Sequence, residues 1–147
     1  MIKIYFDVCS LNRPFDDLTQ DKIKIETEAI INIIQKVCQK IYLAYKSDAI
    51  DFELSKIQNS HKKDQVLNLY NCLNTKKIET TEQIKSRAKE LLSYNIRYMD
   101  ALHIAHCEYA GIDYMITTDK VLINQVNKSN ILKVKVINPV IFVMEEM

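Results

Sequence analysis

Short runs of β-branched and apolar residues alternate with longer segments of helical pattern along the whole chain. No hairpin signal joins one run to the next, so each connection should be a right-handed β-α-β crossover. Strands are predicted at residues 2–7, 41–45, 77–79, 114–117 and 134–137. This alternation predicts an α/β fold: a three-layer α/β/α sandwich around a mainly parallel sheet of roughly five strands.

Helices are predicted between the strands from apolar spacing and from capping residues. They span residues 20–40, 48–54, 60–74, 80–92, 97–110 and 120–127, and a last short helix begins at Pro139. Ser47 should cap the helix that follows the second strand, and Gly111 should end the helix at 97–110. Thr80 and Gln83 are predicted to make a capping box at the start of the helix that runs to about Leu92. One glycine and two prolines leave no interdomain linker, so residues 1–147 should form a single domain.

The charge balance and the cysteine pattern limit the classes of function. The chain has 20 basic and 19 acidic residues, and this balance argues against binding nucleic acid mainly by bulk charge. The four cysteines form no C-x-x-C pair and are expected to be buried thiols in a reducing cytosol. No leader pattern and no apolar run of bilayer length occur, so we expect a soluble, cytoplasmic protein with no membrane partner.

Acidic residues stand at the ends of strands and near the starts of helices. Asp7 follows the first strand, Asp119 follows the fourth, and Asp100 lies in the first turn of a helix. Glu53 lies in the helix after the second strand. Each alone has an ordinary role as a cap, a turn residue or a surface charge. Together they should meet, because the carboxyl ends of parallel strands share one edge of a sheet.

Clustered carboxylates repel one another and raise one another's pKa values, and a divalent cation removes that conflict. Mg²⁺ and Mn²⁺ suit oxygen ligands together with retained waters. A metal held in this way can activate water and neutralise a phosphate during an in-line displacement. The acidic pattern therefore indicates metal-assisted hydrolysis of a phosphodiester.

Three segments resemble the motifs of the PIN domain family, at residues 5–17, 99–105 and 116–119. The resemblance covers nearly the whole chain and implies a ribonuclease fold that uses Mg²⁺ or Mn²⁺, often as the toxin half of a VapBC-type toxin–antitoxin pair. Matched residue by residue, the acidic quartet of the family falls on Asp7, Glu53, Asp100 and Asp119. In toxin relatives the antitoxin tail occupies the acidic cleft, and homodimers are common. The family also contains members that have lost activity.

The resemblance implies a ligand set and some supporting residues. The implied metal ligands are Asp7, Asp100 and Asp119. Glu53 is the loosest match, and three other acids compete for its role: Asp51, Glu26 and Glu28. Thr117 is predicted to orient Asp119 or a metal-bound water through its hydroxyl group.

Basic and imidazole side chains near these motifs have alternative roles. Arg13 is predicted either to bind a substrate phosphate or to form an ion pair with Asp16 or Asp17. No second ligand pair completes a zinc site around His103, so His103 is expected to pack in the core or to support the acids. His106 is expected at the surface.

Two functions are compatible with these residues. The leading prediction is a Mg²⁺- or Mn²⁺-dependent endoribonuclease that hydrolyses RNA and has an antitoxin as its partner, held against the helix at 20–40 or at 48–57. The alternative is a catalytically silent PIN-like module that binds RNA or protein, suggested by the loose match at Glu53 and the near-neutral charge. A haloacid-dehalogenase-type phosphatase is disfavoured, because Cys9 stands where a second aspartate is needed.

Overall fold

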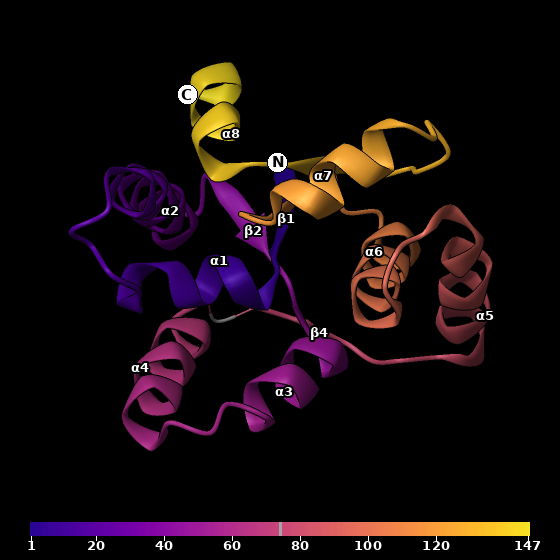
Figure 1. The fold of residues 1–147 in the computed structure, drawn as a ribbon, viewed down its shortest axis with the longest axis horizontal. Coiled ribbons are helices and arrows are strands. Elements are labelled where there is room, and N and C mark those ends of the chain that lie inside the picture. The colour runs from indigo at the N-terminus through magenta and orange to yellow at the C-terminus, as the bar shows by residue number, and fades with distance from the viewer. Residues whose placement is uncertain (74) are drawn as a thin grey trace.

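The main sheet holds four parallel strands in the order β2-β1-β5-β6 (Figure 1). The computed structural model describes residues 1–73 and 75–147. The strands of this sheet are β1 (Ile2–Phe6), β2 (Tyr42–Ala44), β5 (Tyr114–Ile116) and β6 (Lys135–Ile137). Ile4 pairs with Ala44 on one side and with Tyr114 on the other, so β1 is central. The last residues of β1 are fully buried, as expected for a parallel sheet covered on both faces.

Two further strands form a separate parallel sheet, in which β3 (Lys46–Ser47) pairs with β4 (Lys77–Ile78). The segment after β2 pairs with β1 only as far as Tyr45, whose N–H donates to the carbonyl of Ile4 (3.0 Å). The N–H of the next residue, Lys46, donates to the carbonyl of Lys76 (3.1 Å). The strand predicted at 77–79 therefore pairs outside the main sheet. The α/β class and the parallel arrangement are confirmed, with four strands in the main sheet instead of roughly five.

Helices cover both faces of the main sheet. α2 and α8 pack against each other on one side, and α5 and α6 pack against each other on the other side (Figure 1). The α-helices are α1 (Val8–Asn12), α2 (Asp21–Cys38), α3 (Asp48–Ser55), α4 (Ser60–Asn71), α5 (Glu82–Leu91), α6 (Tyr98–Ala110), α7 (Lys120–Asn127) and α8 (Pro139–Glu146). Two 3₁₀ turns, η1 (Arg13–Phe15) and η2 (Leu92–Tyr94), follow α1 and α5. The helix predicted at 60–74 ends at Asn71, and residue 74 lies outside the described residues.

Side-chain caps begin most of the helices that border the carboxyl end of the sheet. Ser47 caps α3 as predicted, by accepting the N–H of Ile50 (3.1 Å). Gly111 ends α6 with φ of 69°, the left-handed conformation expected there. Thr81, and not Thr80, caps α5. The N-cap was therefore predicted one residue too early, and the predicted box with Gln83 is not formed, because Thr81 accepts the N–H of Ile84.

The cysteines differ from their prediction. All four are free thiols, but Cys38 and Cys72 are exposed, whereas Cys107 is fully buried. Cys38 and Cys72 lie at the ends of α2 and α4, where the helices leave the core. Among the described residues, no helix combines the length and the apolar character that crossing a bilayer requires.

Candidate active site

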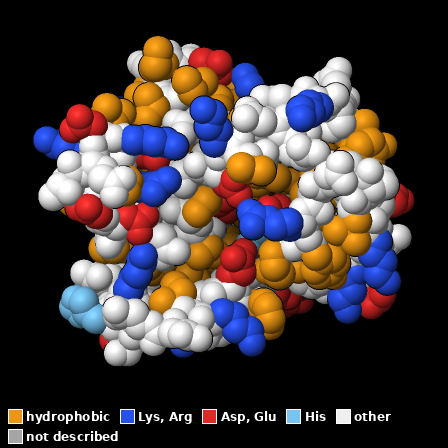
Figure 2. Space-filling model, in the orientation of Figure 1, with side chains coloured by type: hydrophobic (Ala, Val, Ile, Leu, Met, Phe, Trp, Pro, Cys, Tyr) orange, Lys and Arg blue, Asp and Glu red, His pale blue; other side chains and the backbone are white. Residues whose placement is uncertain are grey.

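Two neighbouring strands deliver acids to the same edge of the sheet. Asp7 follows β1, and Asp119 follows β5 by three residues. The N–H of Asp7 donates to the carbonyl of Ile116 (3.2 Å), which keeps the two strand ends together. Figure 2 shows acidic side chains grouped around a basic one near the middle of this face. The carboxyl edge of the sheet therefore carries a cluster of charge.

Asp7 is buried and holds three hydrogen bonds. Its Oδ1 accepts the N–H of Ser10 (3.0 Å), which caps α1. Its Oδ2 accepts the hydroxyl of Thr117 (2.5 Å) and the thiol of Cys9 (2.9 Å). Burial raises the pKa of Asp7, and these three donors oppose that rise. The carboxylate is thus held in one orientation, and its negative charge is costly unless a cation is near.

Thr117 connects the first acid to the last. It is fully buried, and its hydroxyl donates to Asp7 while it accepts the backbone N–H of Asp119 (3.1 Å). Asp119 then caps α7, because its Oδ1 accepts the N–H of Leu122 (3.1 Å). One hydroxyl therefore sets the relative position of two acids from different strands.

Arg97 joins Asp119 to Asp100. Its Nη2 lies 2.9 Å from Oδ2 of Asp119, and its Nε lies 3.3 Å from Oδ2 of Asp100. Burial raises the pKa of Asp100, the charge of Arg97 lowers it, and the charges of Asp119 and Asp7 raise it further. Asp100 and Asp119 therefore line one small depression with Arg97, and Thr117 links Asp119 to the buried Asp7.

Glu53, on α3, contacts Nε2 of His103. The His103 side chain is 1% exposed, and its Nδ1 lies 2.5 Å from the hydroxyl of Tyr5. That hydroxyl in turn lies 2.7 Å from Oγ of Ser47, the cap of α3. A buried chain of hydrogen bonds therefore ties both the start of α3 and its Glu53 to strand β1.

One assignment of protons satisfies every group in this chain. Oγ of Ser47 accepts a backbone N–H, so its own proton is free to go to Tyr5. Burial raises the pKa of Tyr5 well above its ordinary value, so its hydroxyl stays protonated and donates to Nδ1 of His103. Nε2–H of His103 then donates to Glu53. In this order each of the three protons has an acceptor.

The donor set suits a divalent cation, although the oxygens are engaged within the protein. Carboxylates are the ligands that Mg²⁺ and Mn²⁺ prefer. Within the described residues, no group of three or more His, Cys, Asp and Glu side chains is already arranged around one point as a metal site. The reason lies in the contacts: Arg97 holds one oxygen of Asp100 and one of Asp119, and protein donors hold Asp7. As carboxylates, the three acids are chemically suited to hold such an ion.

Arg13 lies away from this cleft. It follows the opposite end of α1 from Asp7, and it pairs with Asp16 (3.2 Å) and Glu26 (3.0 Å). Of the two roles predicted for Arg13, the structure shows the ion pair with Asp16. Asp16 also pairs with Lys62 (2.9 Å). The guanidinium thus joins η1 to α2.

The acids that compete with Glu53 have other surroundings. Asp51 forms an ion pair with Lys77, Glu28 is exposed, and Glu26 accepts the side-chain N–H of Asn138 (2.7 Å). Glu53 alone among these four contacts the buried His103.

The prediction that His106 lies at the surface is wrong. His106 is fully buried, and its Nδ1 donates to the carbonyl of Leu102 (2.7 Å) while its Nε2 accepts the hydroxyl of Thr80 (3.0 Å). Sequence reasoning also missed Arg97, Tyr5 and Ser47 as parts of the site. A tyrosine inside a buried strand was the available signal, because its hydroxyl needs a partner there.

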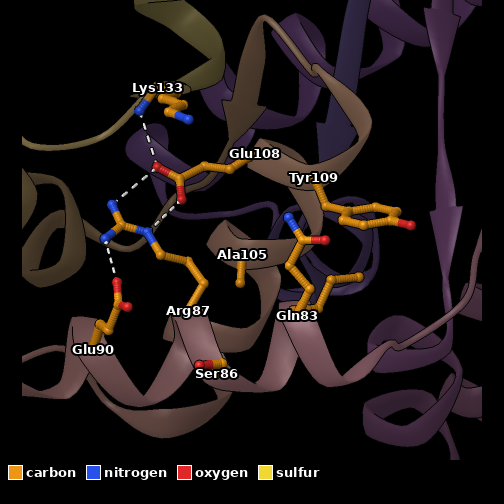
Figure 3. A pocket seen from close by; sticks show the side chains of 9 residues that line it. Gln83, Ser86, Arg87, Glu90, Ala105, Glu108, Tyr109 and Lys133 are labelled. Atoms are coloured by element: carbon orange, nitrogen blue, oxygen red, sulfur yellow. Dashed lines mark hydrogen bonds and ion pairs between the residues drawn. The ribbon is translucent and has the colours of Figure 1, made fainter.

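A depression of about 480 Å³ lies apart from the acidic cleft, over α5 and α6 (Figure 3). It is larger than the depression of about 260 Å³ that Arg97, Asp100 and Asp119 help to line. Its charged groups are already paired, because Arg87 donates to both carboxylate oxygens of Glu108. The smaller depression is the one that the predicted acids Asp100 and Asp119 line.

Comparison with known proteins identifies the family. The family model described as "PIN domain" matches residues 16–128. This chain belongs to the PIN domain family. The matched range includes Glu53, Asp100, Thr117 and Asp119, whereas Asp7 precedes it. The family predicted from the motifs is thus confirmed.

A solved structure shares the fold. It is the crystal structure of VapBC2 from Rickettsia felis bound to a DNA fragment from its promoter, with a TM-score of 0.57 and 14% sequence identity. The match covers 92% of this chain and 98% of the other. No curated protein sequence matches the chain. At this identity the structural likeness shows the PIN fold alone.

Proposed function

We propose that this PIN domain is a Mg²⁺- or Mn²⁺-dependent endoribonuclease that hydrolyses RNA phosphodiester bonds at the acidic cleft. The observation that carries the proposal is the linkage of Asp7, Asp119 and Asp100 through Thr117 and Arg97. These acids come from two strand ends and one helix, and they take up one edge of the sheet. An acidic cleft at that place is where open α/β sheets bind their ligands.

The residues of the cleft divide the work. Asp7, Asp100 and Asp119 would hold the ion, which when bound lowers the pKa of water and neutralises the phosphate. Thr117 keeps Asp7 and Asp119 in register for that purpose. Glu53 is one-third exposed and held by His103, so it suits the role of a general base for the attacking water.

A toxin role with an antitoxin partner is part of the proposal. The structural relative carries the name VapBC2, and PIN membership supports the same class. Ile25 and Ile31 on α2 and Phe52 on α3 are about half exposed, which suits the two predicted contact helices. A homodimer remains a prediction from the family resemblance.

The test is cleavage of an end-labelled single-stranded RNA with Mg²⁺, with Mn²⁺ and with EDTA. Activity should appear only with metal, and Asp7→Asn should lower it roughly 10²-fold or more. Asp51→Asn is the matched control, because Asp51 is an acid on α3 that pairs with Lys77 outside the cleft. Equal cleavage in EDTA contradicts the proposal.

The silent PIN-like module remains the second candidate, and the engagement of Asp100 and Asp119 by Arg97 favours it. Such a module would bind RNA without cutting it and would take up no Mn²⁺. Titration with Mn²⁺ separates the two functions, because a nuclease must bind the ion at the cleft.

A further inference from the structure

Arg97 occupies the mouth of the acidic cleft. Its guanidinium touches Asp100 on α6 and Asp119 before α7, two acids that are 18% and 21% exposed. The Arg97 side chain itself is 78% exposed. A cation of the chain therefore stands where the candidate metal ligands converge, and it is open to solvent.

The backbone of Arg97 is fixed while its side chain is free to move. Asn95 takes a left-handed conformation with φ of 61°, and the next residue, Ile96, is buried. The carbonyl of Arg97 accepts the N–H of Ala101 (2.8 Å), which starts α6. Only the long side chain can swing out of the cleft, so removing it from the acids needs no change of fold.

The position of this arginine is unfavourable without the acids. Arg97 is the N-cap residue of α6, and positive charge at a helix N-terminus opposes the helix dipole. Its two carboxylate partners compensate for that, but exposed ion pairs of this kind are weak. A divalent ion offers the same oxygens twice the charge, and it competes with the guanidinium for them.

We propose that Arg97 is a built-in counter-ion that competes with the divalent cation for Asp100 and Asp119 and sets the metal concentration at which the cleft loads. The inference rests on the proposed metal site. In the absence of metal, Arg97 keeps the two acids together and reduces their repulsion. When metal binds, the guanidinium moves away from the two carboxylates into solvent.

The test is Mn²⁺ binding to the whole chain. Binding is measured by calorimetry and by the loss of the free Mn²⁺ signal in electron paramagnetic resonance. Arg97→Gln removes the charge and keeps most of the side-chain length. It should lower the Kd for Mn²⁺ about three- to ten-fold, the range expected for losing a weak ion-pair competitor. Lys120→Gln is the matched control, because Lys120 is exposed and adjacent to Asp119. That control should change the Kd by less than about two-fold.

Each outcome decides something different. If Arg97→Gln and the unmodified chain bind Mn²⁺ with the same Kd, the competition is refuted while the metal site stands. If neither binds Mn²⁺, the proposed nuclease function fails, and the competition fails with it. If Arg97→Gln weakens RNA binding and leaves the Kd for Mn²⁺ unchanged, Arg97 is a phosphate ligand and the competition is likewise refuted.

Discussion

Two arginine–carboxylate clusters in this protein differ in how completely their charged groups are paired. Between α5 and α6, Arg87 donates to both oxygens of Glu108, to Glu90 and to the carbonyl of Ile131 (Figure 3). Glu108 is 7% exposed and also accepts the backbone N–H of Lys133 (3.0 Å). Hydrogen bonding to Glu108 is the main cause that raises the pKa of Arg87. This cluster is complete and holds two helices and a loop together.

The acidic cleft lacks that balance. Two carboxylates, Asp100 and Asp119, face one guanidinium that is 78% exposed. A third carboxylate, Asp7, is linked to Asp119 through Thr117. Burial raises the pKa of both Asp7 and Asp100, so ionising them is costly in the metal-free protein. The comparison teaches that an arginine next to an acid is structural when each group is saturated. Where negative charge is left over, the site is prepared for another cation.

The difference between the two clusters is tested most strongly by comparing Asp100→Asn with Glu108→Gln. With Mn²⁺ present, Asp100→Asn should reduce RNA cleavage roughly 10²-fold or more, because it removes a candidate metal ligand. Glu108→Gln should leave kcat within about two-fold, since Glu108 contacts nothing in the cleft and a conservative change far from the chemistry is tolerated. Initial rates on a labelled RNA measure both. Similar losses in the two variants would show that cleavage reports general folding and not the acidic cleft.

For stability we expect the opposite ranking, with the larger loss in the Arg87 cluster. Glu108→Gln leaves the guanidinium of Arg87 without its buried partner, and the free energy of unfolding should fall by about 1–2 kcal/mol after allowance for the partial exposure of Arg87. Arg97→Gln should cost less than about 0.5 kcal/mol, because its pairs are exposed. Urea denaturation in EDTA gives both values. A larger loss for Arg97→Gln than for Glu108→Gln contradicts the distinction between the clusters.

Sequence position predicted the acids of the cleft because topology alone brings strand ends together. Asp7 and Asp119 follow β1 and β5, which are neighbours in the sheet, and this placement needed no side-chain detail. Arg97 was missed, because where a long exposed side chain points depends on its tertiary neighbours. Arg13 drew attention instead for its closeness in sequence to Asp7, although α1 carries it away from the cleft.

Helix α6 shows why the histidines were hard to place. It lies between the sheet and α5, and its buried residues run almost continuously from Ala101 to Cys107. A helix buried on several sides presents no clear polar face, so periodicity could not tell His103 from His106. Both are buried, and only the contact with Glu53 makes His103 part of the site. The prediction that the strand at 77–79 joins the main sheet was also wrong, since nothing in so short a run specifies its partner strand.

His103 sharpens the comparison, because it links the cleft to the core in a way that the Arg87 cluster does not. His103→Phe removes both ring nitrogens and should lower kcat about ten-fold with little change in KM, since Glu53 loses its orienting donor. His103→Gln can return a donor to Glu53 and should recover part of that loss. A purely packing role would give the opposite order, with Phe tolerated better than Gln.

The smallest expected effect is a change in pH dependence. Burial raises the folded pKa of Asp7 above its ordinary value of 3.8, so the folded protein binds more protons than the unfolded chain between the two values. Stability from this group is present at low pH and is lost as pH rises through that window. In EDTA at pH 7, Asp7→Asn should therefore melt a few degrees higher than the unmodified chain, and the difference should vanish near pH 3.5.

Added Mn²⁺ should reverse the order of the melting temperatures of Asp7→Asn and the unmodified chain. Mn²⁺ binds the folded state of the unmodified chain and should raise its Tm, while Asp7→Asn gains little. Glu108→Gln should melt lower with and without Mn²⁺, because its loss comes from an ion pair that needs no added cation. If Asp7→Asn melts lower than the unmodified chain at pH 7 in EDTA, the charge of Asp7 is already fully compensated within the protein. The cleft would then be as complete as the Arg87 cluster, and no second cation would be required there.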